Sequence, residues 1–77
     1  MDLEKFVYNF VDQLDEVDNE IITSKTEFRG IYDWSSLMAL SIIAMVDAEY
    51  NVKLKGDDIR NSVTIEDLFN IVASRKK

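Results

Sequence analysis

The stretch that decides the fold is IYDWSSLMALSIIAMVDAEY, which spans residues 31–50. It places two adjacent serines, Ser35 and Ser36, directly before a long apolar run. The apolar residues repeat with helical spacing and predict a helix from about Ser36 to Asn51. Apolar groups fall on nearly every face, which indicates either deep burial or an exposed patch for a partner. The spaced residues are Leu37, Leu40, Ile43, Val46 and Tyr50, with Met38, Ile42 and Met45 on other faces.

Two amphipathic segments predict the first and last helices. A helix is expected from about Asp2 to Glu16, because its apolar residues form one stripe. Those residues are Leu3, Phe6, Val7, Phe10 and Leu14. The segment TIEDLFNIV predicts the last helix, with Thr64 as its N-cap residue and Asp67 reaching back as in a capping box.

The remaining segments complete the predicted fold. Gly56 breaks the helical pattern, and residues 57–60 can form one short helical turn. Residues 17–35 predict a long loop without secondary structure, and such loops are often functional. Its apolar residues are expected to pin it to the core: Ile21, Ile22, Phe28 and Ile31. The sequence therefore predicts an all-α, four-helix bundle with a short third helix and a long first loop, in a single domain over residues 1–77.

Composition narrows the classes of function. The chain has 77 residues, no Cys, no His and a net charge of −6. A serine nucleophile needs a base within hydrogen-bond reach, so without His or a nearby Lys the chain is expected not to be an enzyme. An acidic surface repels phosphate backbones, so basic proteins fit better as partners than nucleic acid does. The apolar run of residues 37–46 is too short to span a bilayer, and a monomeric, soluble, cytoplasmic protein is expected.

The serine pair has two interpretations. Ser is a preferred N-cap residue, so one of the two serines can simply start the helix. If Ser35 is the cap, Ser36 falls at the first helical position with its side chain free to point outward. A phosphate on Ser36 would then sit at the positive end of the helix dipole, near free backbone N–H groups. Residue type and position alone leave both interpretations open.

Three other features have structural and functional alternatives. DQLDEVDNE, residues 12–20, gathers carboxylates, but it lacks the Gly and the closing Glu of an EF-hand, so no metal site is expected. Trp34 can be a binding hot spot or can pack over the loop. Met38 and Met45 can form an adaptable docking patch or fill the core.

An ordered set of motifs resembles the acyl carrier protein family. Ser36-Leu37 matches part of the family's Asp-Ser-Leu at the start of the second helix, and Phe28-Arg29 precedes it at the usual separation of an aromatic and a basic residue. The segment LMALSIIAMVDAEYNVKL resembles the family's second helix along its length, without a gap. The segments DDI and SVTIEDLFNIV look like its third and fourth helices, so the resemblance covers nearly the whole chain.

The resemblance implies a discrete carrier that holds acyl groups as thioesters, for fatty-acid-like or specialised acyl biosynthesis. A 4′-phosphopantetheine arm from coenzyme A would be attached to Ser36 by a phosphopantetheinyl transferase, with Ser35 as the alternative attachment site. Acyl-handling enzymes (a ketoacyl synthase, an acyltransferase or an adenylating ligase) would dock near residues 34–47. The expected docking residues are Trp34, Leu37, Met38, Ser41, Met45 and Asp47.

Departures from the family pattern keep two alternatives open. Ser35 replaces the usual Asp, and Met38, Ser41 and Ala48 stand where many members have acids. The depleted acidic face favours docking through the apolar area of Met38, Ile42 and Met45, and it also fits a carrier of aminoacyl or other small acyl groups. The other alternative is a helical protein-interaction module that never receives the arm.

Overall fold

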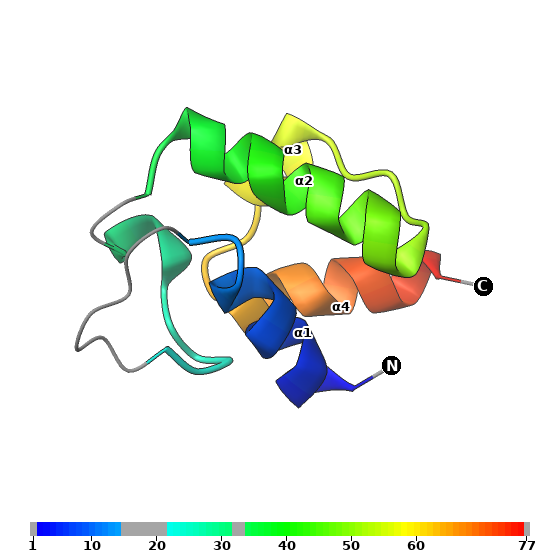
Figure 1. Cartoon of the computed structure of the whole chain (residues 1–77), viewed down its shortest axis with the longest axis horizontal. Coiled ribbons are helices and arrows are strands. Elements are labelled where there is room, and N and C mark those ends of the chain that lie inside the picture. The colour runs from blue at the N-terminus through cyan, green and yellow to red at the C-terminus, as the bar shows by residue number, and fades with distance from the viewer. Residues whose placement is uncertain (1, 15–21, 32–33, 77) are drawn as a thin grey trace.

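The computed structural model describes residues 2–14, 22–31 and 34–76, and within them the chain is all-α (Figure 1). The helices are α1 (Leu3–Val11), α2 (Ser36–Tyr50), α3 (Gly56–Arg60) and α4 (Ile65–Arg75), with a short 3-10 turn, η1 (Phe28–Gly30), between α1 and α2. The predicted fold class, with three main helices and a short third one, is confirmed.

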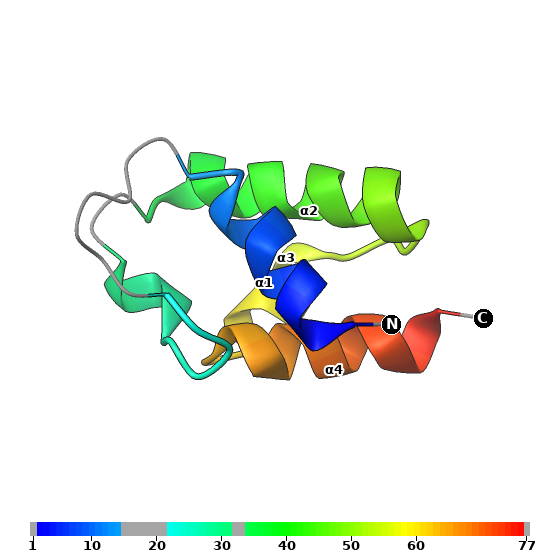
Figure 2. The ribbon, with the colours of Figure 1, turned by 60° about the horizontal axis from the view of Figure 1, so that its bottom comes forward.

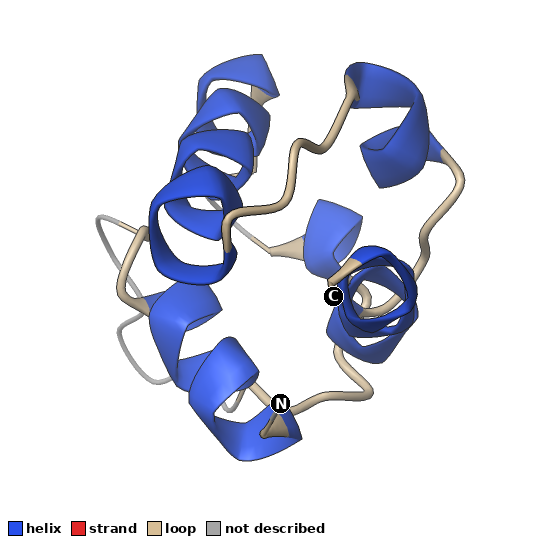
Figure 3. Ribbon diagram, turned by 90° about the vertical axis from the view of Figure 1, so that its right-hand side faces the viewer, coloured by secondary structure: helices blue, strands red, loops and turns tan. Residues whose placement is uncertain are grey.

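The helices surround one core. Figures 1 and 2 show α1 crossing between α2 and α4, with both ends of the chain on the same side of the molecule. Figure 3 looks along α4 and shows α1 and α3 on opposite sides of the core. The side chains with no exposed surface are Phe6, Phe10, Phe28, Ile42, Val46, Ile65, Leu68, Val72 and Ser62. All of these except Ser62 are apolar, and their removal from water is the main force that holds the helices together.

Capping residues fix both ends of α2. The Ser35 side chain accepts a hydrogen bond from the Met38 backbone N–H at 3.3 Å. Asn51 adopts the left-handed conformation with φ 57°, and its N–H donates to the Asp47 carbonyl at 3.0 Å. Asn tolerates this conformation better than most residues, so it ends the helix without a glycine. The predicted bounds of α2 are confirmed, with Asn51 as the cap just beyond the last helical residue.

The first helix is shorter than predicted. It ends at Val11. Beyond it, the N–H groups of Gln13 and Leu14 donate to the backbone carbonyls of Phe10 and Val11, three residues earlier, as in a 3-10 turn. This turn still buries Leu14, so the last residue of the apolar stripe reaches the core although the helix has ended. The predicted end at Glu16 is therefore wrong, and residues 15–21, which include most of the acidic run and Ile21, lie outside the described residues.

The loop before α2 contains more structure than predicted. It includes η1, and Glu27 forms an isolated antiparallel bridge with Thr64 at the start of α4. Phe28 and Ile31 are buried and Ile22 packs against the core, as predicted. Pairing with a segment far along the chain holds this loop in place, and local sequence patterns carry no signal for such a contact.

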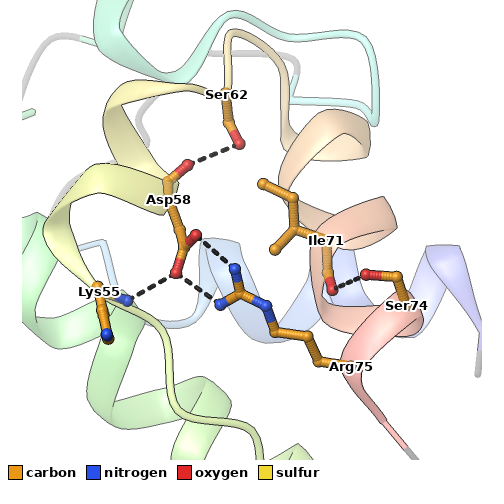
Figure 4. A network of polar contacts seen from close by, with 6 residues as sticks. All are labelled: Lys55, Asp58, Ser62, Ile71, Ser74 and Arg75. Atoms are coloured by element: carbon orange, nitrogen blue, oxygen red, sulfur yellow. Dashed lines mark hydrogen bonds and ion pairs between the residues drawn. The ribbon is translucent and has the colours of Figure 1, made fainter.

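Side-chain hydrogen bonds join the two last helices to their caps and to each other. The predicted capping box of α4 is confirmed: Thr64 Oγ1 accepts from the Asp67 N–H at 3.1 Å, and Asp67 Oδ2 accepts from the Thr64 N–H at 3.0 Å. Asp58 on α3 accepts two hydrogen bonds from the Arg75 guanidinium on α4, at 2.6 and 2.7 Å (Figure 4). Asp58 also accepts from the Lys55 backbone N–H at 2.9 Å, so one carboxylate caps α3 and ties it to α4.

These contacts make stability depend on pH. Hydrogen bonds from Arg75 lower the pKa of Asp58, and backbone N–H groups of Thr64 and Val63 lower the pKa of Asp67. As pH falls through the ordinary carboxyl value of 3.8, the unfolded chain takes up protons first, which favours unfolding. The stabilisation is fully present above that pH and is lost as pH falls through the lowered pKa values of the folded protein.

We predict that the melting temperature falls as pH is lowered from about 7 through the ordinary carboxyl value of 3.8, and that Asp58→Asn lowers it at neutral pH while flattening this acid slope. Thermal melts followed by circular dichroism across this range check the prediction. Asp12→Asn is the control, because it removes a carboxylate that makes no side-chain hydrogen bond among the described residues. Equal acid slopes in wild type and Asp58→Asn would contradict the account.

Candidate functional site

The two serines at the start of α2 have different roles. Ser35 is extended, with φ −156° and ψ 174°, and its hydroxyl is used by the cap on Met38 N–H. Ser36 is the first helical residue, and its side chain is exposed. The structure therefore confirms Ser35 as the N-cap residue and leaves Ser36 as an accessible hydroxyl at the end of the helix.

Ser36 borders an open groove of about 550 Å³. One wall comes from α2, the other from α3, and the loop before α2 contributes two large side chains. The lining residues are Arg29, Trp34, Ser35, Ser36, Ala39, Leu40, Ile43, Gly56, Ile59 and Arg60. The described lining residues thus comprise an apolar set, two arginines and two serines, and none of them is acidic.

Trp34 is packed onto the core and also lines this groove. Its ring stacks on Phe10 with a centroid distance of 6.1 Å and an interplanar angle of 7°, and it lies 4.9 Å from the Phe28 ring. Such offset aromatic contacts add to the gain from burial. The packing role considered for Trp34 is confirmed, while its role in docking stays a prediction.

Arg29 is a groove residue that the sequence analysis did not single out as functional. Its Nη1 donates to the Ile59 carbonyl on α3 at 3.0 Å, and its Cζ lies 5.2 Å from the Phe28 ring centroid. Arg60, the other guanidinium, forms an ion pair with Asp57 one turn earlier on α3. The separation of Phe28-Arg29 from Ser36 is part of the resemblance to the acyl carrier family. It does not predict that Arg29 and Ser36 line the same groove.

The structure corrects part of the expected docking surface. Met38 and Met45 are only 6% and 5% exposed and Ile42 is fully buried, so these side chains fill the core and offer no apolar docking area. Leu37 and Leu40 are 71% and 62% exposed and present apolar surface instead. Ser41 and Asp47 are half-buried, and Asp47 pairs with Lys53 at 2.8 Å. Docking roles for Leu37, Ser41 and Asp47 stay predictions.

The described residues contain neither a candidate metal site nor a helix that could cross a membrane. Within residues 2–14, 22–31 and 34–76, no group of three or more His, Cys, Asp or Glu is placed to hold a metal ion. None of the helices in the described part of the chain is long and apolar enough to cross a membrane. Comparisons with protein-family models, with curated proteins and with solved structures found no match to this chain.

The different roles of the serines predict different effects of substitution. Ser35→Ala removes the cap and should cost about 1 kcal/mol of stability, which lowers the melting temperature by roughly 4–8 °C in a domain of this size. Ser36→Ala should leave the melting temperature nearly unchanged, because its exposed hydroxyl is not the cap and Ala favours helix. Thermal melts of both variants measure this, and a larger loss for Ser36→Ala would reverse the assignment.

Proposed function

We propose that the protein is an acyl carrier that holds acyl groups as thioesters on a 4′-phosphopantetheine arm attached to Ser36. The observation that supports this most is that the two serines have different positions. The Ser35 hydroxyl accepts the capping hydrogen bond, and Ser36 is exposed at the first turn of α2. The resemblance of the chain to acyl carrier proteins gives this exposed hydroxyl its chemical meaning.

Attachment of the arm needs a separate transferase, because no His, Lys or carboxylate is among the described residues that line the groove with Ser36. Ser36 Oγ forms a new P–O bond to the pantetheine-side phosphate of coenzyme A, and the pyrophosphate P–O bond breaks. Adenosine bisphosphate leaves with the electron pair of that bond, and the hydroxyl proton passes to a base on the phosphopantetheinyl transferase. This agrees with the absence of His from the whole chain.

In this proposal the protein supplies position and recognition, and the cofactor supplies the thioester. The exposed Leu37 and Leu40 offer apolar contact to acyl-handling enzymes, next to the attachment point. A ketoacyl synthase, an acyltransferase or an adenylating ligase would dock there. A cysteine-free monomer fits the reducing cytoplasm, where we place the protein.

Loading in vitro tests the proposal. Wild type, Ser36→Ala and Ser35→Ala are incubated with coenzyme A and a broad-range phosphopantetheinyl transferase, and intact mass is measured. We expect wild type and Ser35→Ala to gain one phosphopantetheine group and Ser36→Ala to gain none. Loading of Ser36→Ala but not of Ser35→Ala would move the site to Ser35.

A protein-interaction module without the arm is the second candidate, and the exposure of Leu37 and Leu40 favours it. Exposed leucines one helical turn apart offer apolar contact whether or not Ser36 is modified. Folded wild-type protein that gains no mass in the loading experiment would support this candidate over the carrier.

A further inference from the structure

Arg29 is held in position in the groove that Ser36, the proposed attachment point, also lines. The hydrogen bond to Ile59 fixes it to α3, and its contact with the Phe28 ring fixes it to the core. A guanidinium has five N–H donors. Among the described residues Arg29 makes this one hydrogen bond and no ion pair, so its other donors can bind an anion without first being ordered.

The charge around the groove singles out Arg29. The chain as a whole has a net charge of −6, yet the described residues that line the groove include two arginines and no acid. Asp57 already compensates the charge of Arg60. The charge of Arg29 is therefore the one in this groove that no carboxylate of the described residues balances, and Ser36 borders the same groove.

We propose that Arg29 is a positioning residue that pairs with the phosphodiester of an arm attached to Ser36. This inference rests on the proposed function. Guanidinium and phosphate match in geometry and form charge-assisted hydrogen bonds. The groove volume of about 550 Å³ falls within the range of about 300–1,000 Å³ for small-molecule sites. Its walls, Trp34, Leu40 and Ile43, provide apolar contact for the dimethyl-bearing part of the arm.

The pairing has a consequence for stability. A phosphodiester adds a negative charge to a domain that is already acidic, and repulsion alone would make the loaded form less stable. A pair with Arg29 exists only in the folded protein, so it opposes this effect. In this proposal the pairing outweighs the repulsion, so loading should raise the melting temperature, and the rise should depend on Arg29.

A thermodynamic cycle tests this. Melting temperatures are measured for unloaded and loaded forms of wild type, Arg29→Gln, Arg29→Lys and the control Lys53→Gln, with loading verified by intact mass. We expect loading to raise the melting temperature by roughly 2–4 °C in wild type and Lys53→Gln, and less at high salt. The rise should be lost in Arg29→Gln and partly kept in Arg29→Lys, which retains the charge without the planar fork. The loaded and unloaded forms of the same variant are compared with each other. Loss of the Arg29–Ile59 hydrogen bond lowers the stability of both forms and therefore cancels.

A second readout does not depend on stability. The ³¹P resonance of the loaded protein should differ between wild type and Arg29→Gln, with Arg29→Lys between them. Equal changes in melting temperature and equal ³¹P shifts in wild type and Arg29→Gln would overturn the pairing while the carrier function stands. Wild type that gains no mass would overturn the carrier function and the pairing together.

Discussion

The burial of one face of α2 is the constraint on which the rest of the structure depends. Met38, Ile42, Met45 and Val46 all enter the core, together with Tyr50 at the end of the helix. Because side chains three and four residues apart share a helix face, fixing these positions fixes every other position on α2. Ser36, Leu37 and Leu40 must then point outward, and the hydroxyl becomes accessible as a consequence of core packing.

Contacts from distant parts of the chain place this exposed helix end at the edge of a groove. The rings of Phe10, Phe28 and Trp34 pack together and hold the loop before α2 against the core. That placement brings Arg29 to the groove, where it reaches across to α3. The two hydrogen bonds from Arg75 to Asp58 hold α3 against α4. The groove wall formed by α3 therefore depends on a polar contact as well as on apolar packing.

Local signals in the sequence predicted the elements that have local causes. The bounds of α2 and the start of α4 follow from apolar periodicity and from the serine pair and Thr64 as candidate caps, which act within one turn. The face of α2 could not be predicted, because apolar residues occur all around it and periodicity does not choose between them. Met38 and Met45 were accordingly assigned to both the core and the docking surface, and the structure places them in the core. The bridge from Glu27 to Thr64 and the position of Arg29 arise from contacts between distant segments, for which one sequence gives no pattern.

We propose that Ser36 carries the arm in the cell. The most direct measurement is the mass of the protein isolated from the cells that make it, followed by peptide mapping. Cleavage after Arg29 and Lys53 gives one peptide that contains both serines, so fragmentation must separate Ser35 from Ser36. The account predicts a phosphopantetheine group on Ser36. An unmodified peptide, or the group on Ser35, would contradict it.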